Sequence, residues 1–240
     1  MQAVGNFFEL VKRRIKGEPI QYIIGCQEFM GMDFRVDQRV LIPRRDTEIL
    51  VEHVIRKVKE FEGPVHIVEV GTGSGAIAVS LAANLPKARV TAIDIDSGAL
   101  EVAKGNATLH RVQERIVFLQ GDLFEPLKDG PETGRFDVLV SNPPYIPTVE
   151  IETLEVQVKD YEPRIALDGG WDGLDFYKRL ASLAPGYLKP GALWAVEVGY
   201  NQADAVKGIL EKVGIYTEIQ LIKDLSGIDR VVSARLAGGR

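Results

Sequence analysis

The sequence has few of the residues that disulfides and metal sites require. Its 240 residues include one cysteine, Cys26, which cannot form a disulfide within the chain, and three scattered histidines without the spacing of metal ligands. No uninterrupted apolar stretch approaches the roughly 18 residues of a membrane-spanning helix. The first residues place their basic cluster after the apolar ones and lack a small-residue cleavage site, which disfavours a secretory signal. We therefore expect a cytoplasmic protein without a metal or a membrane segment.

Basic residues are also fewer than acidic ones. The chain has 29 Lys and Arg against 34 Asp and Glu, a formal net charge of -5. This balance disfavours broad, sequence-independent affinity for nucleic acid, although a local basic patch is compatible with it. The hydrophobic fraction of 45% and the charged fraction of 26% are typical of a globular protein. The length fits one large domain, with or without a small appendage.

The first part of the chain predicts a helix and a hairpin. Apolar residues recur at helical spacing up to Ile15, and Gly17 follows as a helix stop. Residues 25–30 and 32–37 alternate apolar and polar side chains around Gly31, which is typical of a β-hairpin. The pattern leaves open whether the helix packs on the main domain or belongs to a larger helical unit. We divide the chain into residues 1–45 and a main domain, residues 46–240.

The main domain predicts an α/β fold. A helix begins near Asp46 and ends before Gly63, and strands and helices then alternate, which indicates a mostly parallel sheet with helices on both faces. The connection around Gly227 is too short for a parallel crossover, so the last two strands should pair antiparallel. The seven expected strands span residues 65–70, 89–93, 116–120, 136–141, 192–198, 216–221 and 229–234. The expected helices between them span residues 75–84, 97–109, 174–183 and 202–213.

A glycine-rich turn lies between the first of these strands and its helix. Its glycines, beginning at Gly71, let the backbone approach a ligand closely. Asp94 ends the second strand, where a carboxylate can accept hydrogen bonds from both hydroxyls of a ribose. The turn alone is compatible with a tight connection that binds nothing. Together with Asp94, it predicts a cofactor that contains a nucleoside.

The glycine pattern does not by itself identify the cofactor. Residues 71–76 also satisfy the relaxed dinucleotide pattern GxGxxG/A. Two features favour S-adenosylmethionine. Glu69 can face the ammonium of an amino-acid group, and Asp122-Leu123 follow the third strand, where an adenine could be held. For Asp122, a helix cap or loop role is the simpler alternative.

The fourth strand is followed by Asn142-Pro143-Pro144-Tyr145 at the edge of the sheet where open α/β folds bind ligands. The Asn142 side-chain oxygen and the Pro143 carbonyl can each accept a hydrogen bond from an NH2 group. They would orient a planar nitrogen and stabilise the positive charge that develops as it attacks a methyl donor. The prolines restrict the backbone there, and the Tyr145 ring can lie against a planar group. The simpler interpretation is a turn with a packing tyrosine.

Many segments together resemble the HemK-type family of release-factor glutamine N5-methyltransferases. The resemblance runs through nearly the whole chain, in family order, and is carried by GEPIQYI (17–23), EFMG (28–31), LIPR (41–44), TE (47–48), GTGSG (71–75), GDLF (121–124), NPPY (142–145), YEP (161–163), DGG (168–170) and DR (229–230). The glycine turn and NPPY alone also occur in adenine N6-methyltransferases, so the flanking segments decide the assignment.

The resemblance implies a Rossmann-like class I methyltransferase fold and a protein substrate. The substrate expected for the family is the Gly-Gly-Gln glutamine of peptide chain release factors, methylated on its side-chain amide nitrogen. The residues expected to bind S-adenosylmethionine are Gly71, Thr72, Gly73, Ser74, Gly75, Asp94, Leu123 and Asn142. Those expected to receive the glutamine are Asn142, Pro143, Pro144 and Tyr145, with Arg44 and Thr47 helping to line the site. For Thr47, a role at the start of a helix is an equal alternative.

The chain departs from the family pattern in two places. Residues 43–48 read PRRDTE where the family has PRPETE. From the resemblance we expect residues 1–45 to be a remnant of the family's helical substrate-docking domain. Four other functions stay open on sequence alone. They are glutamine methylation of a ribosomal protein, adenine-N6 methylation of a flipped base in nucleic acid, a nucleotide-binding dehydrogenase and a binding module without turnover.

Overall fold

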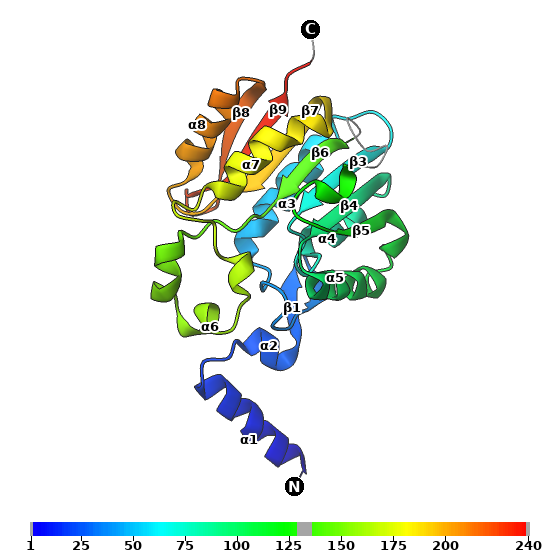
Figure 1. Cartoon of the computed structure of the whole chain (residues 1–240). Coiled ribbons are helices and arrows are strands. Elements are labelled where there is room, and N and C mark those ends of the chain that lie inside the picture. Colours follow the sequence, from blue (N-terminus) through cyan, green and yellow to red (C-terminus); the bar gives the residue numbers. More distant parts are fainter. Residues whose placement is uncertain (1, 129–135, 239–240) are drawn as a thin grey trace.

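A seven-stranded sheet forms the centre of the protein. The computed structural model describes the backbone of residues 2–128 and 136–238, and the side chains of these residues from Phe7 onward. The strand order is β5-β4-β3-β6-β7-β9-β8 (Figure 1). The first five in this order are parallel: β5 (Ile116–Gln120), β4 (Ala88–Asp94), β3 (Val65–Val70), β6 (Phe136–Ser141) and β7 (Leu188–Glu197). Strand β9 (Asp229–Leu236) lies between β7 and β8 (Tyr216–Lys223) and is antiparallel to both. The predicted mostly parallel sheet with an antiparallel C-terminal strand is confirmed.

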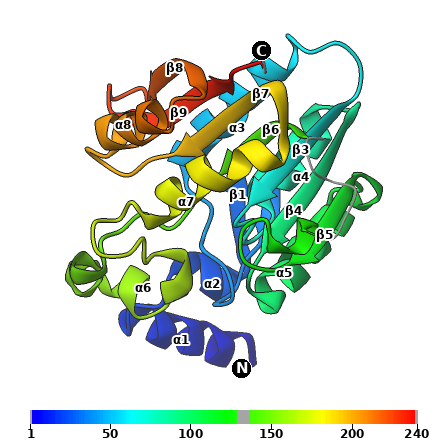
Figure 2. The same ribbon diagram turned by 45° about the horizontal axis from the view of Figure 1, so that its top comes forward.

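Helices cover both faces of the sheet because neighbouring residues of each strand point to opposite sides. In β3, Ile67 packs in the core under α3 (Arg45–Val58), α4 (Ala76–Asn84) and α5 (Ser97–Leu109). The next residue, Val68, packs in the core under α7 (Asp175–Leu183) and α8 (Ala203–Val213). Figure 2 shows these two groups of helices on opposite sides of the sheet. Buried strands with two apolar faces explain the continuous apolar runs of the sequence.

The N-terminal part consists of α1 (Gln2–Ile15), α2 (Ile20–Ile24) and an antiparallel hairpin of β1 (Cys26–Phe29) and β2 (Met32–Arg35). The predicted helix and hairpin are confirmed, whereas the single turn of α2 was not predicted. Phe29 and Phe34 are buried in the core beside α3 and α4, which anchors the hairpin to the main domain. Helix α1 projects away from the sheet (Figure 1), with Phe7 and Ile15 exposed.

The segment between β6 and α7 contains only short helices. They are η3 (Thr148–Thr153), α6 (Val156–Lys159) and η4 (Arg164–Ala166), and three further turns of this kind are η1 (Gln113–Arg115), η2 (Glu125–Leu127) and η5 (Ala184–Gly186). Over the described ranges, no helix has the length and apolar character needed to span a bilayer. The same residues hold no cluster of His, Cys, Asp and Glu suited to a metal ion.

Candidate active site

The candidate site lies where the direction of chain winding reverses. Strands β3 and β6 are adjacent and parallel, with Val70 paired to Ser141, while β4 and β7 lie on their outer sides. The Ser141 hydroxyl donates to the Val70 carbonyl at 2.7 Å. A Cβ built on Gly71 would lie 3.9 Å from the Asn142 carbonyl oxygen. The glycine turn and the NPPY loop therefore lie side by side at the switch point, where open α/β sheets bind ligands.

A cavity of about 240 Å³ opens at this point. Its wall is mainly apolar, with a few polar groups, which is typical of a small-molecule site. The predicted site residues that line it are Gly71, Gly73, Asp94, Asp122, Leu123, Asn142, Pro143 and Pro144. Further wall residues that were not predicted as site residues include Arg39, Val40, Leu41, Ile165, Phe176 and Arg179. The structure therefore brings together the glycine turn, the ends of three strands and the NPPY loop.

The glycine turn is held against the end of β4. The backbone N–H groups of Gly71 and Thr72 donate to the Ile93 carbonyl at 2.8 and 3.1 Å. Thr72 and Ser74 are buried behind the turn and do not line the cavity. Gly75 lies at the start of α4 with φ of 80°, and a Cβ there would approach the Ala103 Cβ to 3.0 Å. Gly75 thus serves the close packing of α4 on α5.

Asp94 reaches the cavity with its carboxylate partly engaged. Oδ2 accepts from the Gly73 N–H at 2.8 Å, and Oδ1 accepts from the Asp96 N–H at 3.0 Å. Each carboxylate oxygen has a second acceptor site, so both can still receive a hydroxyl. Burial raises the pKa of Asp94, and these backbone hydrogen bonds oppose that shift. Asp94 is therefore placed as a ribose ligand requires.

Glu69 lies beneath the turn, not on the cavity wall. Its Oε2 accepts from the Thr72 hydroxyl at 2.7 Å, and its buried Oε1 has no hydrogen-bond partner within residues 2–128 and 136–238. Burial raises its pKa to about 8, and the nearby Asp94 charge adds to this shift. A buried acceptor without a partner is costly, and a cationic ligand group above the turn would relieve that cost.

The loop after β5 forms the opposite wall. Leu123 is buried with φ of 52°, a strained backbone conformation for a leucine. Asp122 pairs with Arg179 of α7, so its carboxylate is already engaged by a cation. Asp122 lines the cavity as predicted. Because Arg179 occupies one of its carboxylate oxygens, fewer acceptor positions are left for the adenine that it was expected to bind.

Asn142 is oriented by α3. Its Nδ2 donates to the Thr47 Oγ1 at 3.1 Å, and Thr47 is buried in the first turn of that helix. The amide oxygen is thereby available to accept a hydrogen bond. Thr47 does not line the cavity. It lies in the first turn of α3, as the alternative expected, and its hydroxyl contacts the NPPY loop at Asn142.

Tyr145 turns away from the cavity, towards the end of β7. Its hydroxyl donates to Glu197 Oε1 at 3.3 Å, and burial, followed by the Glu197 charge, raises its pKa. Gly169 and Gly199 pack so closely on it that a Cβ at either position would come within 2.7 and 2.9 Å of Tyr145 atoms. Tyr145 is thus fixed by its surroundings and supports the loop from behind.

Arg44 does not line the cavity. Its Nη2 donates to both carboxyl oxygens of Glu162, at 2.8 and 2.6 Å. Burial raises the pKa of Glu162, while Arg44 opposes the shift. Since Pro163 lines the cavity, this ion pair ties the segment before α3 to the loop that closes the wall.

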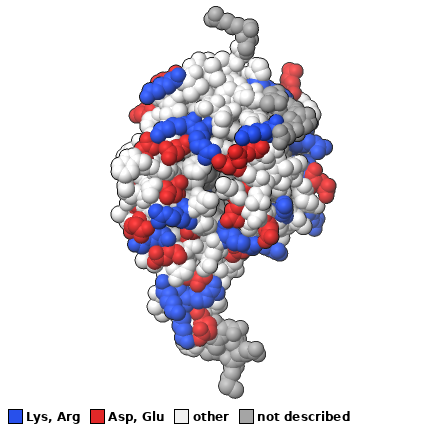
Figure 3. Space-filling model, in the orientation of Figure 1, with Lys and Arg blue, Asp and Glu red and all other residues white. Residues whose placement is uncertain are grey.

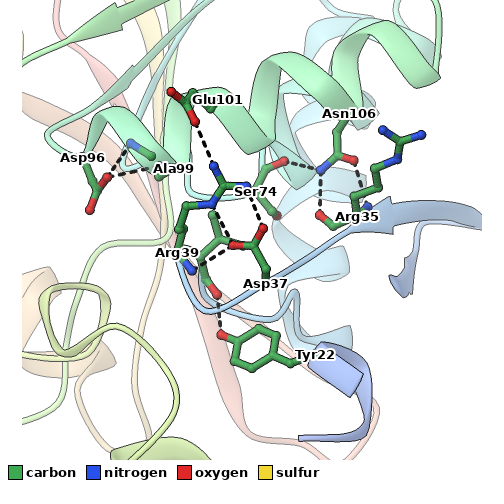
Figure 4. A network of polar contacts seen from close by, with 11 residues as sticks. Tyr22, Arg35, Asp37, Arg39, Ser74, Asp96, Ala99, Glu101 and Asn106 are labelled. Atoms are coloured by element: carbon green, nitrogen blue, oxygen red, sulfur yellow. Dashed lines mark hydrogen bonds and ion pairs between the residues drawn. The ribbon is translucent and has the colours of Figure 1, made fainter. Parts of the chain in front are cut away.

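The N-terminal part contributes to the wall through a hydrogen-bond network (Figure 4). Asn106 Nδ2 donates to the carbonyls of Arg35 and Ser74 at 3.0 and 2.8 Å, so the hairpin and the glycine turn share one buried side chain. The Tyr22 hydroxyl donates to the Val40 carbonyl at 2.6 Å. Because Val40 lines the cavity, residues before position 46 belong to the site.

Glu197, Glu162 and Gln202 were not predicted as site residues, although Glu162 belongs to the YEP segment (161–163) that carries the family resemblance. Gln202 Nε2 donates to the Tyr145 carbonyl at 2.8 Å, and its Oε1 accepts from the Gly199 N–H at 3.1 Å. One signal was available for Glu197. It ends an apolar strand of the parallel sheet, as Asp94 does, and a carboxylate there faces the same edge. Nothing in the local sequence indicates the partners of Glu162 or Gln202.

Two family descriptions match the sequence: "Methyltransferase small domain" over residues 45–158 and "PrmC N-terminal domain" over residues 2–25. The chain is 48% identical to the release factor glutamine methyltransferase of Geobacter sulfurreducens, over 95% of this chain and 76% of that protein. It is also 48% identical to the protein of that name from Moorella thermoacetica, over 95% and 78%. Among solved structures, the release factor-specific protein-(glutamine-N5) methyltransferase of Alicyclobacillus acidocaldarius matches with a TM-score of 0.51 and 34% identity, over 85% of this chain and 99% of that one.

Proposed function

Because the chain belongs to the family of release factor glutamine methyltransferases, we propose that it methylates the side-chain amide nitrogen of the Gly-Gly-Gln glutamine in peptide chain release factors. The methyl donor in this proposal is S-adenosylmethionine. The observation that carries the proposal is the placement of Asn142 and Pro143 beside the glycine turn, on the wall of one cavity.

The residues around the cavity fit this cofactor. Asp94 keeps acceptor capacity for ribose hydroxyls, and the apolar side chains of Leu123 and Ile93 offer surfaces for an adenine. The buried Glu69 Oε1 has no partner among the described residues and would be compensated by an ammonium group. When bound, S-adenosylmethionine supplies a methyl group on a positively charged sulfur.

The substrate amide would be held by two acceptors. Asn142 Oδ1 is left available by the Nδ2 contact to Thr47, and the Pro143 carbonyl is fixed by the two consecutive prolines. Each would accept one hydrogen bond from the glutamine NH2 group. These bonds strengthen as positive charge develops on the nitrogen, which favours the transition state over the ground state. We assign no catalytic base, because the alkylated nitrogen is strongly acidic and loses its proton readily.

We also propose that residues 1–45 help to dock the protein substrate and that residues 46–240 perform the transfer. The match to the PrmC N-terminal domain ends at residue 25, and the match to the methyltransferase small domain begins at residue 45, which supports a boundary in this region. Phe7, Phe8 and Ile15 of α1 are exposed, as a surface for a protein partner would be.

The face of the molecule drawn in Figure 3 gives little support to nucleic acid as substrate. Figure 3 shows a small group of basic side chains on α1, next to an acidic one, and both signs interspersed over the rest of this face. An adenine methyltransferase needs a basic surface that follows the phosphate backbone. A protein substrate requires none.

The test is transfer of labelled methyl from S-adenosylmethionine to a purified release factor. We expect label on the wild-type factor and none on a factor whose Gly-Gly-Gln glutamine is changed to alanine. Ribosomal proteins and DNA serve as parallel substrates. Label on either of them, with an unlabelled release factor, would reject the proposal.

A further inference from the structure

Glu197, the last residue of β7, is a buried carboxylate that no step described above uses. It is 2% exposed and lies outside the cavity wall. A buried carboxylate costs free energy unless other groups satisfy it. Its surroundings therefore show what retains it at this position.

Two hydroxyls from the candidate site face this carboxyl group. The Tyr145 hydroxyl donates to Oε1 at 3.3 Å, and a hydrogen bond from the Thr47 hydroxyl lowers the pKa of the group. Oε2 has no hydrogen-bond partner of regular geometry within the described ranges, so it keeps acceptor capacity for a hydroxyl proton such as that of Thr47. Both Thr47 and Tyr145 contact or belong to the NPPY loop.

The direction of these hydrogen bonds follows from simple donor and acceptor rules. An ionised carboxylate only accepts, so Thr47 is the donor in the hydrogen bond that lowers the pKa of Glu197. The Thr47 oxygen then can only accept from Asn142, and it selects the Nδ2 end of that amide, as observed at 3.1 Å. The opposite end, Oδ1, is left for the substrate. An amide turned by 180° would present N–H donors to the substrate NH2 group and repel it.

We propose that Glu197 is a positioning residue for methyl transfer, which fixes the side-chain amide of Asn142 through Thr47 and the NPPY loop through Tyr145. This inference rests on the proposed function for its effect on turnover. Its structural content, a three-residue relay from Glu197 to Asn142, is independent of which substrate is methylated.

The relay depends on the ionised form of Glu197. Burial is the main cause that raises its pKa to about 7, with Asp46 of α3 adding to the shift. Thr47, Tyr145 and Arg230 of β9 oppose it. The Tyr177 hydroxyl of α7 donates to the backbone carbonyl of Glu197 at 3.0 Å, not to its carboxyl group. Protonation gives the Glu197 carboxyl group an O–H donor, which can reverse the direction of the hydrogen bonds from Glu197 through Thr47 to Asn142.

The test combines turnover with a spectroscopic readout of Asn142. We expect E197Q to lower kcat about tenfold or more, as loss of an aligned polar contact in a transition state does, and to leave S-adenosylmethionine affinity unchanged. Wild-type kcat should rise with pH through about 7, and E197Q should lack this rise. Y177F is the matched control, since it removes a buried hydroxyl beside Glu197 without touching the relay. It should keep both kcat and the pH profile.

If E197Q does not fold, a second pair of variants, T47V and T47S, still tests the inference. T47V removes the hydroxyl at nearly constant volume and should lose turnover, whereas T47S keeps the hydroxyl and should retain it. Wild-type kcat and pH profile in E197Q, or equal turnover in T47V and T47S, would overturn the inference.

Nuclear magnetic resonance of the Asn142 side-chain NH2 group tests the relay without any substrate. Its signals, assigned by their loss in N142A, should shift with the same midpoint as the Glu197 carboxyl carbon in the wild type. Signals that do not respond to this titration would refute the relay. An enzyme that shows the coupled shift but leaves release factors unmethylated would instead refute the proposed function.

Discussion

Glu69, a buried carboxylate beneath the glycine turn, connects a single residue to cofactor binding. The pKa of Glu69 is raised to about 8 by burial and by the charge of Asp94, so at neutral pH most of its population is protonated. A carboxyl group that pairs with an ammonium must be ionised. Binding and proton release are therefore coupled at this residue.

We predict that S-adenosylmethionine binding at about pH 7 releases protons and that affinity rises with pH up to about 8. Isothermal titration calorimetry in two buffers of different ionisation enthalpy measures the number of protons. E69Q should bind more weakly and release fewer protons. Wild-type binding with no exchange of protons would contradict the role of Glu69.

The residues that sequence patterns could predict are those whose role depends on neighbours in the chain. Asp94 ends one strand of the parallel sheet and Asn142 directly follows the end of another, so their place at the edge follows from the pattern alone. Arg44 was expected at the site, but it pairs with Glu162, more than one hundred residues away in the chain. Such tertiary partners leave no trace in local spacing.

At the scale of elements, the start of α4 depends on one glycine. Gly75 combines φ of 80° with close contact to Ala103 of α5. Any side chain there strains the backbone and pushes the two helices apart. Gly208 lies inside α8, and a Cβ built there meets nothing within 4 Å.

We predict opposite effects of the same substitution at these two glycines. G75A should destabilise the protein by roughly 1–3 kcal/mol, through backbone strain and overpacking. G208A should stabilise it by up to about 1 kcal/mol, because alanine has the higher helix propensity. Chemical denaturation of both variants measures the changes. A neutral G75A would show that α4 and α5 separate easily.

Long elements with clear periodicity were predicted correctly from the sequence. The seven strands and the helices between them occupy nearly the expected ranges. The short α2, η3 and α6 were not predicted, since a single turn shows no period. The insertion of β9 between β7 and β8 was not predicted either, because strand order reflects pairing between distant segments.

At the scale of the whole molecule, His53 links stability to pH. It is buried on α3, where its Nε2 contacts the Ser233 hydroxyl of β9 at 2.9 Å. Burial is the main cause that lowers its pKa to about 4, and Arg56 adds to the shift. As the pH falls, the unfolded chain protonates this histidine at a higher pH than the folded protein does. Acid therefore shifts the equilibrium towards the unfolded state.

We predict that the contribution of neutral His53 to the free energy of unfolding is fully present above about pH 6.5. It is lost as the pH falls to about 4, a decrease of roughly 3 kcal/mol. Glu69 and Glu197 have raised pKa values, so their contributions to the free energy of unfolding decrease as the pH rises, opposite to that of His53. The difference in unfolding free energy between wild type and H53Q therefore isolates the effect. Parallel curves for the two proteins across this range would contradict it.

The most direct test of the whole account is tandem mass spectrometry of a release factor after incubation with the enzyme and S-adenosylmethionine. We predict one methyl group on the side-chain amide nitrogen of the Gly-Gly-Gln glutamine, and its absence with the N142A enzyme. A methyl group on another residue, an unmodified factor with an enzyme that binds the cofactor, or undiminished methylation by N142A would contradict it.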